Sequence, residues 1–305
     1  MPNTLDDRTW GMLIKRIGKG ECTPFLGAGA CYGVLPLAPD VAKKWAAKYK
    51  YPFPDSFDLV KVAQYVALNY DRMTPKEEIL AILAEEGKKP DFKDQLQPHR
   101  MMADLPLPIY LTTNYDNLMA DALKSRHRDA KRELCRWNSL VEKHPSIFDD
   151  KPPFQPTVAN PVVFHLHGHD EVPESLVLTE DDYMDFLVNL SAKKNVIPEV
   201  IQGALEKTAL LFVGYKIVDW NFRVLMRSIS RYMEPDMRRI SVAVMLPPSA
   251  EEVSAANVPE SAQQKAQEYL DMYYDSLGIR VYWGTAKEFV AELRKRMDAA
   301  AAAGN

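Results

Sequence analysis

The sequence has few cysteines, and none lies at the spacing that usually holds a metal ion. Its 305 residues include only Cys22, Cys31 and Cys135, and no two of these form a CxxC pair. Structural zinc sites and redox-active disulfides commonly depend on such pairs. We therefore expect neither a structural metal site nor a disulfide framework.

Long apolar runs and a strong excess of one charge are also missing. No stretch approaches the ~20 apolar residues of a membrane-spanning helix, and the start of the chain shows neither a secretory nor a transit signal. The 38 basic and 42 acidic side chains give no global basic field of the kind that marks a dedicated nucleic-acid binder. These absences predict a cytoplasmic protein without direct membrane contact, and they leave direct nucleic-acid binding open.

Short apolar runs typical of buried strands alternate with helical patterns over most of the chain. The predicted strands cover residues 22–26, 109–113, 134–137, 162–164, 209–213, 239–246 and 278–282. Such alternation indicates βα units and a mainly parallel sheet. The predicted fold class is therefore α/β, with helices flanking the sheet.

One segment interrupts this alternation. Residues 39–104 show only helical patterns, and we expect them to form a helical insertion packed over the sheet. The main domain would then be discontinuous, formed by residues 1–38 and 105–297. The alanine-rich residues 298–305 are expected to form a disordered tail.

Two glycines follow the first predicted strand in the segment PFLGAGAC, residues 24–31. The backbone N–H groups of Gly27, Ala28, Gly29 and Ala30 have no large side chains that would keep a pyrophosphate away, and glycine allows the positive φ of an anion-binding nest. The complete GxGxxG spacing is absent. Alone, this motif therefore fits a phosphate-binding loop and a plain strand-to-helix turn equally well.

Polar residues also follow the predicted strand at 109–113. Thr113, Asn114 and Asp116 lie at its carboxyl end, where ligands bind in open α/β sheets. Asn114 or Asp116 can also cap the helix that follows, because both residue types are common at that position. Capping and ligand contact are compatible, so both interpretations stay open.

The segment HLHGH, residues 165–169, follows another predicted strand. Alternation along an extended chain would turn His165, Leu166 and His167 to opposite faces in succession, so that one histidine can face the ligand edge. Three interpretations stay open: histidines without a chemical role, an HxH metal site, and a catalytic base beside a flexible glycine. A metal site would need ligands from later strand ends, where only Asp219 is available, so we disfavour it.

Two further segments have alternative interpretations. Gly214, Tyr215 and Asp219 follow the predicted strand at 209–213, where a turn can approach a ribose or a phosphate, although this pattern alone is unspecific. The basic run at 124–136 (KSRHRDAKRELCR) can contact nucleic acid or a partner. A solvated helix face is the interpretation that we favour for it.

In this order, the four motifs GAGAC, TTNYD, LHG and VGYKIVD resemble the sirtuin family, and more closely its bacterial sirtuin-like NADase branch found in anti-phage defence proteins. The resemblance covers most of the chain. It implies a Rossmann-like NAD-binding domain, with NAD+ as the substrate and no metal. It further implies that NAD+ is cut to nicotinamide and ADP-ribose.

The resemblance also assigns roles to individual residues. It implies that Asn114 holds a water or a ribose hydroxyl near the anomeric carbon, that Asp116 contacts the nicotinamide amide, and that His167 is the general base. For His167, a pKa near the ordinary ~6.5 would suit that task. The implied nucleotide-binding residues are Gly27, Ala28, Gly29, Ala30, Cys31, Thr113, Gly214, Tyr215 and Asp219.

The departures from the family are informative. Cys31 occupies the place of the usual small hydroxyl residue, and Thr113 and Tyr115 replace the Gln and Ile that are typical of deacetylases. The four zinc-binding cysteines of protein deacetylases are missing. Deacetylation is therefore disfavoured, and hydrolysis of the nicotinamide glycosidic bond is the chemistry that we expect.

Unregulated NAD+ hydrolysis would be toxic to the cell, so the resemblance implies a controlled effector in anti-phage defence. Control would come from self-assembly into a homo-oligomer or from a partner such as a hexameric DNA translocase (an ATPase) or an Argonaute-like protein. The alternative is a non-catalytic subunit that senses NAD+ or ADP-ribose or serves as a scaffold. Asn114 and His167 argue against that alternative.

Overall fold

The computed structural model describes residues 5–193, 196–215, 239–247 and 261–303. Within these residues, seven strands form one sheet in the order β3-β4-β2-β1-β5-β6-β7, and every pairing is parallel. The strands are β1 (Cys22–Leu26), β2 (Ile109–Thr112), β3 (Lys131–Leu134), β4 (Val162–His165), β5 (Ala209–Val213), β6 (Ser241–Met245) and β7 (Ile279–Trp283). The predicted α/β class with a Rossmann-like sheet is confirmed.

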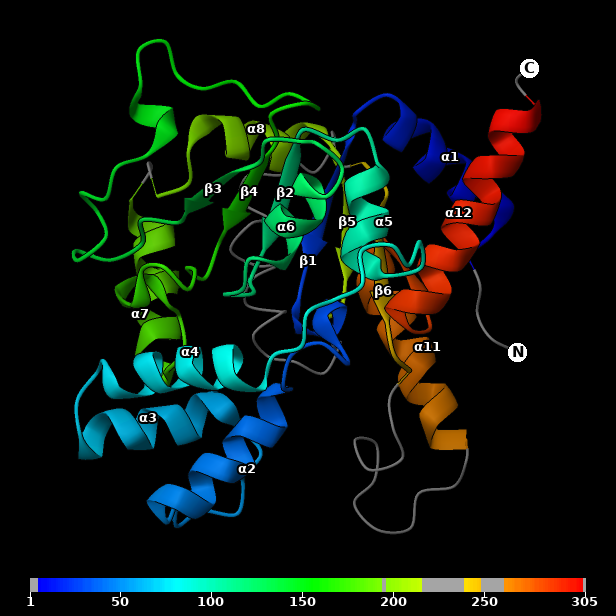
Figure 1. Cartoon of the computed structure of the whole chain (residues 1–305). Helices are drawn as coiled ribbons and strands as arrows, with labels where there is room; N and C mark the ends of the chain where they lie inside the picture. The colour runs from blue at the N-terminus through cyan, green and yellow to red at the C-terminus, as the bar shows by residue number, and fades with distance from the viewer. Residues whose placement is uncertain (1–4, 194–195, 216–238, 248–260, 304–305) are drawn as a thin grey trace.

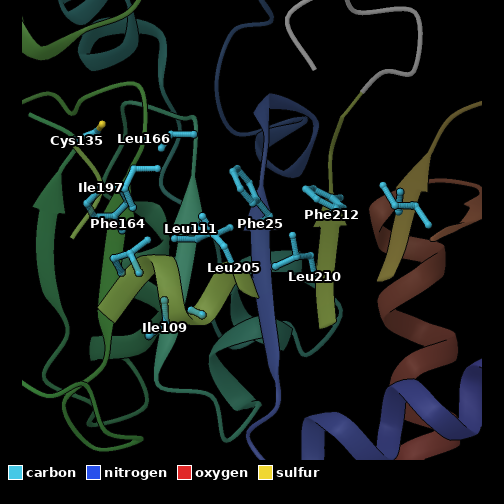
Figure 2. Packing of buried hydrophobic residues seen from close by; sticks show 14 of the residues in the cluster. Phe25, Ile109, Leu111, Cys135, Phe164, Leu166, Ile197, Leu205, Leu210 and Phe212 are labelled. Atoms are coloured by element: carbon cyan, nitrogen blue, oxygen red, sulfur yellow. The ribbon is translucent and has the colours of Figure 1, made fainter. Parts of the chain in front are cut away.

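Both faces of the sheet are buried, because alternate residues of each strand enter two separate cores. Phe25 of β1 and Phe212 of β5 belong to one core, and their rings stack with centroids 5.3 Å apart. Leu26 and Val213, the next residues along, belong to the other core. Figure 2 shows the first core, where side chains from β2, β1 and β5 point to the same face of the sheet. The nearly continuous apolar runs seen in the sequence are typical of such parallel strands.

Helices cover both faces and give three layers (Figure 1). The core that contains Phe25 is closed by α7 (Glu180–Ala192), α8 (Glu199–Lys207) and α11 (Ser261–Ser276). The opposite core is closed by α1 (Asp7–Gly18), α5 (Pro98–Asp104), α6 (Leu118–Lys124) and α12 (Ala286–Ala303). No helix in these described ranges is long and apolar enough to cross a membrane.

Three helices form a group of their own beyond the edge at which β1 ends. These are α2 (Ala38–Tyr49), α3 (Leu59–Asn69) and α4 (Thr74–Glu86), drawn in blue to cyan below the sheet in Figure 1. Their apolar faces meet in a third core around Trp45, Val62 and Ile79. Residues 39–104 contain helices and no strand, as the sequence predicts. Of these helices, α5 packs over the sheet as expected, whereas the apolar faces of α2, α3 and α4 meet in a core of their own. The domain boundaries themselves stay a prediction.

A buried ion pair ties this helical group to the rest of the molecule. Lys76 of α4 has a side chain only 6 % exposed, and its Nζ lies 3.0 Å from Oδ1 of Asp182. The same ammonium donates to the backbone oxygen of Leu176 at 2.8 Å. Oδ2 of Asp182 accepts the N–H of Thr179, which completes the capping box of α7. Because a buried charge without its partner costs several kcal/mol, this contact strongly constrains the relative position of α4 and α7.

Two sequence expectations are wrong at this level. The expected tail at 298–305 is helical through Ala303, because alanine has the highest intrinsic helix propensity and α12 simply continues; residues 304–305 lie outside the described ranges. The strand predicted at 134–137 lies earlier, at Lys131–Leu134, so it takes up part of the basic run.

The basic run is therefore not a solvated helix face. Arg128 is buried and donates to the backbone oxygens of Leu105 and Leu107, among others. Arg132 forms ion pairs with Asp170 and Glu171. These two charges are used within the fold, which removes them from any nucleic-acid contact.

The loops that follow the central strands β1 and β5 are in direct backbone contact. The N–H of Gly27 donates to the oxygen of Val213 at 2.9 Å, and the N–H of Gly29 donates to the oxygen of Gly214 at 2.8 Å. A Cβ on Gly29 would lie 2.9 Å from the Cα of Gly214. Gly214 has a φ of +85°, and a Cβ there would overlap the backbone of Ala30. Glycine is therefore required on both sides of this contact.

We predict that Gly214→Ala destabilises the protein by more than about 3 kcal/mol, because it adds left-handed strain to a backbone overlap. The matched control is Gly203→Ala. Gly203 lies inside α8, and a methyl group on its Cα would meet no neighbouring segment within 4 Å, so this change should stabilise the protein by about 0.5–1 kcal/mol. Urea unfolding followed by circular dichroism measures both. Equal stability of Gly214→Ala and the wild type would contradict this account of the contact.

Candidate active site

The structure brings the four sequence motifs to one edge of the sheet. They follow β4, β2, β1 and β5, which are neighbours in that order, and parallel strands all end at the same edge. This is also where the chain crosses from one half of the sheet to the other, the usual ligand position in open α/β sheets. Of the predicted site residues, Asp219 lies outside the described residues.

The glycines of the loop after β1 are needed for a different reason from the one predicted. Residues Ala28–Cys31 form a 3₁₀ turn, and Gly27 has an ordinary φ of −114°. Neither Gly27 nor Gly29 is among the glycines with positive φ. The N–H groups of Gly27, Gly29 and Ala30 donate to backbone oxygens of the protein. These glycines serve the close contact with Gly214, and their role in phosphate binding stays a prediction.

Asn114 is held on several sides. Its side-chain nitrogen Nδ2 donates to the oxygen of Gly27 at 3.1 Å and to Sγ of Cys31 at 3.2 Å. Its backbone N–H donates to Oγ1 of Thr112 at 3.0 Å. Because these bonds use both hydrogens of the amide, the side-chain oxygen Oδ1 is the end left for a ligand. The loop geometry thus presents Asn114 as a hydrogen-bond acceptor.

Asp116 and Cys31 are joined directly. Oδ1 of Asp116 accepts the N–H of Leu118 at 2.9 Å at the start of α6. The N-cap residue of this helix is Asn117, so the expectation that Asn114 or Asp116 is the N-cap is wrong. Oδ2 accepts the S–H of Cys31 at 3.4 Å. Burial, followed by the charge of Asp116, raises the pKa of the Cys31 thiol well above its ordinary value. Cys31 is therefore an uncharged thiol that links the glycine loop to the polar loop after β2.

Thr113 and Tyr215 also meet at this edge. Oγ1 of Thr113 lies 3.0 Å from the hydroxyl of Tyr215, and that hydroxyl donates to the backbone oxygen of Leu26 at 3.0 Å. The Tyr215 ring stands edge-on against Phe25. The loop after β5 thus reaches across the end of β1 to the loop after β2.

His167 has aromatic neighbours instead of the polar ones that surround Asn114. Its ring packs edge-on against Tyr183 and Phe186 of α7, with centroids 5.3 and 5.2 Å away. Burial lowers the pKa of His167 to about 3. Among the described residues, no hydrogen bond joins it to Asn114. The expectation of a pKa near 6.5 is therefore wrong for this structure, because the ring lies in an apolar pocket and not in water.

The alternation predicted for these residues holds as far as Leu166 and fails at His167. Phe164 and Leu166 enter one core, and Val163 enters the other. Leu166 enters the same core as Phe186, the residue that His167 contacts, because β4 ends at His165 and the chain then turns. Gly168 makes this turn with a φ of +82°, where a Cβ would overlap Ser175. The glycine of the LHG motif is thus required by the backbone.

His165 supports the polar loop, a role that the sequence analysis did not identify. Its Nδ1 lies 3.0 Å from the backbone oxygen of Asn114, and Nε of Arg132 donates to its Nε2 at 3.5 Å. Burial, then the positive charge of Arg132, lowers the pKa of His165 well below its ordinary value. Both ring nitrogens are occupied, which argues against the HxH metal site. The contact between Arg132 and His165 depends on the register of β3 against β4, which no local pattern in the sequence gives.

We predict a specific acid sensitivity from His167. Its folded pKa of about 3 lies below the ordinary 6.5, so the unfolded chain takes up a proton that the folded chain does not. The contribution of His167 to the free energy of unfolding is therefore fully present above about pH 6.5, and it falls by about 1.4 kcal/mol per pH unit below that pH. Between about pH 7.5 and pH 5, the variant His167→Phe should therefore lose about 2 kcal/mol less stability than the wild type. Urea midpoints at both pH values test this, and an unchanged difference between them would refute it.

Comparison with known proteins identifies the family of this chain. The family model described as SIR2-like domain matches residues 108–279, more than half of the chain. The chain is 29% identical over 184 residues to NAD(+) hydrolase ThsA of Bacillus cereus (strain MSX-D12), a match that covers 60% of this chain and 34% of that protein. It is 24% identical over 233 residues to NAD(+) hydrolase ThsA of Enterococcus faecium, covering 74% of this chain and 44% of that protein.

A third relative, NAD(+) hydrolase ThsA of Acinetobacter baumannii (strain 532279), is 26% identical over 184 residues, or 60% of this chain and 33% of that protein. The chain thus spans less than half the length of these curated relatives. Four motifs at one edge of a parallel sheet and a family match over more than half of the residues lead to one assignment. The chain belongs to the SIR2-like family.

Proposed function

We propose that this protein hydrolyses NAD+ at the bond between nicotinamide and ribose, releasing nicotinamide and ADP-ribose. The observation that carries the proposal is the cluster at the ends of β1 and β2, where hydrogen bonds gather Gly27, Asn114 and Asp116. The relatives that bear the name NAD(+) hydrolase support the choice of substrate.

The reaction breaks the glycosidic bond between C1′ of the ribose and the nicotinamide nitrogen. The electron pair leaves with nicotinamide, which becomes neutral, and positive charge develops on the ribose ring. A water then attacks C1′ and loses a proton. Such oxocarbenium-like transition states are stabilised by placed dipoles and negative charges.

The residues of this chain suit these steps. Oδ1 of Asn114, left free by the two bonds from Nδ2, can accept a hydrogen bond from the attacking water or a ribose hydroxyl. The carboxylate of Asp116 places negative charge near the developing cation. His167 is neutral, since burial lowers its pKa, and its free imidazole lone pair can take the proton. Negative phosphates of a bound nucleotide would raise its basicity.

Nucleotide binding is proposed for the loops around these residues. The N–H groups of Gly27, Gly29 and Ala30 already bond within the protein, so the glycine loop would serve the phosphates by its small residues, which let them approach the backbone closely. Thr113, Gly214 and Tyr215, which close over the end of β1, would contact the nearby ribose. The full proposed set is Gly27, Ala28, Gly29, Ala30, Cys31, Thr113, Gly214, Tyr215 and Asp219.

We further propose that this activity belongs to a regulated effector of anti-phage defence. The sirtuin-like NADase resemblance supports this role, because uncontrolled loss of NAD+ would harm the cell that makes the protein. Control would come from self-assembly or from a partner such as a hexameric translocase or an Argonaute-like protein. In a cytoplasmic setting, NAD+ would be directly accessible.

The second candidate is a non-catalytic sensor of NAD+ or ADP-ribose. The aromatic surroundings of His167 are the observation that favours it, because its ring packs against Tyr183 and Phe186 and, among the described residues, forms no hydrogen bond with Asn114, whereas a base must reach the proton that it removes. The two candidates differ in one measurable property. A sensor binds NAD+ without releasing nicotinamide, whereas a hydrolase releases it when activated.

We predict that the activated protein releases nicotinamide and that Asn114→Ala and His167→Ala each lower this rate by at least about 100-fold. The matched controls are Asn189→Ala and His144→Ala. Within the part of the chain that the structure describes, the side chain of Asn189 donates to the oxygen of Asp185 in its own helix, and the ring of His144 bonds its neighbour Pro145, so both variants should retain activity. Chromatography of the products, with and without proteins encoded next to this gene and nucleic acid, measures the rate.

Calorimetric titration with NAD+ accompanies this assay and separates the candidates. NAD+ binding without nicotinamide release under every activating condition would establish the sensor. Full activity of either site variant would show that the residue is wrongly assigned.

A further inference from the structure

A buried polar cluster lies behind the proposed active site, built around the sulfur of Cys31. Three side chains meet it, two from the loop after β2 and one from α5: Nδ2 of Asn114 at 3.2 Å, Oδ2 of Asp116 at 3.4 Å and Nε2 of His99 at 3.8 Å. His99 belongs to α5 and is 1 % exposed. His99 has no role in the predicted site, yet through the sulfur of Cys31 it reaches two of the three predicted catalytic residues, Asn114 and Asp116.

The direction of each hydrogen bond in this cluster follows from Gln97. Its side-chain oxygen accepts the N–H of Arg100 at 2.7 Å, so its side-chain nitrogen faces Nδ1 of His99 at 3.0 Å and donates to it. The proton of the neutral imidazole is therefore on Nε2, the atom that faces Cys31. Burial lowers the pKa of His99, which keeps the ring neutral.

The sulfur consequently accepts two N–H groups and donates one S–H. His99 and Asn114 donate to it, and its own hydrogen goes to Asp116. A neutral thiol has this capacity for one donated bond and several accepted bonds. The chain of bonds from Arg100 through Gln97 and His99 thus sets the direction in which the thiol points.

A metal ion is the competing explanation of the same cluster. The ligand atoms of Cys31, His99 and Asp116 all lie within 4.8 Å of one another, a spacing that a cation can bridge. A metal would need the lone pair of Nε2, whereas Gln97 places the lone pair of His99 on Nδ1. It would also need a thiolate, which burial disfavours at Cys31. The geometry fits a hydrogen-bonded network better.

We propose that His99 is a positioning residue for NAD+ hydrolysis and that it acts through the Cys31 thiol. This proposal rests on the proposed function. His99 fixes the thiol, the thiol keeps Nδ2 of Asn114 turned inward, and Oδ1 of Asn114 therefore faces the substrate. Loss of His99 lets the amide rotate, so a fraction of the molecules presents a donor where an acceptor is required.

The test uses paired variants that keep or remove each hydrogen-bonding group. His99→Gln keeps an N–H near the position of Nε2, and His99→Met removes it. Cys31→Ser keeps a donor and acceptor, and Cys31→Ala removes both. We expect His99→Met to lower kcat by about 10-fold with KM changed by less than about 2-fold, and Cys31→Ala to lower kcat by at least as much. We expect the conservative variants to recover most of the lost activity.

The double variant Cys31→Ala/His99→Met decides whether His99 acts through the sulfur. If it does, the double variant is no slower than Cys31→Ala alone; two separate effects would instead multiply. Thermal melting confirms that each variant is folded. Unchanged kcat in folded His99→Met, multiplied effects in the double variant, or failure of folded His99→Gln to recover activity would each overturn the proposal.

A second readout is independent of activity. The side-chain amide signal of Asn114 in an NMR spectrum, identified by its loss in Asn114→Ala, should shift in His99→Met and return in His99→Gln. An unmoved signal overturns the positioning role even if the protein hydrolyses no NAD+, a result that would instead refute the proposed function. Inhibition of the wild type by added Zn²⁺ that disappears in His99→Gln would replace the network with a metal site.

Discussion

The contact between the loops after β1 and β5 is the constraint on which the rest of the site depends. These two central strands come from distant parts of the chain, and their ends meet backbone to backbone at Gly29 and Gly214. No side chain fits between them. The contact fixes where the 3₁₀ turn begins, and the turn in turn places Cys31 beneath the loop after β2. The position of the polar cluster around Cys31 thus depends on the close packing of Gly29 against Gly214.

The site divides into a polar part and an apolar part. Around Cys31, the polar atoms that face the sulfur have partners whose direction is set by a neighbour, and Oδ1 of Asn114 is left to accept a bond from a ligand. Around His167, aromatic rings take the place of such partners. The first environment suits orientation of a substrate. The second suits a base that stays unprotonated until a ligand changes its surroundings.

The sequence was sufficient for much of the fold, because patterns of buried parallel strands are local. The bounds of β1 and β5 match the predicted runs residue for residue. The grouping of the four motifs could also be predicted from the sequence, since the carboxyl ends of parallel strands meet at one edge of the sheet.

The remaining features depend on packing between distant segments. The glycines of the first loop were expected to supply positive φ, whereas Gly27 is needed for close approach to the loop after β5. The pKa of His167 depends on α7 lying against it. His99 lies in a helix far along the chain from Cys31, and no local pattern links the two.

The buried ion pair of Lys76 has a mechanical consequence. Lys76 holds the backbone oxygen of Leu176, and the next residue, Val177, donates its N–H to the oxygen of His167 at 3.0 Å. The oxygen of Val177 accepts the hydroxyl of Tyr115, the neighbour of Asn114, at 2.7 Å. A force applied to α4 therefore reaches both predicted catalytic segments through one short stretch of extended chain. The position of α2, α3 and α4 is thus linked to the positions of His167 and Asn114.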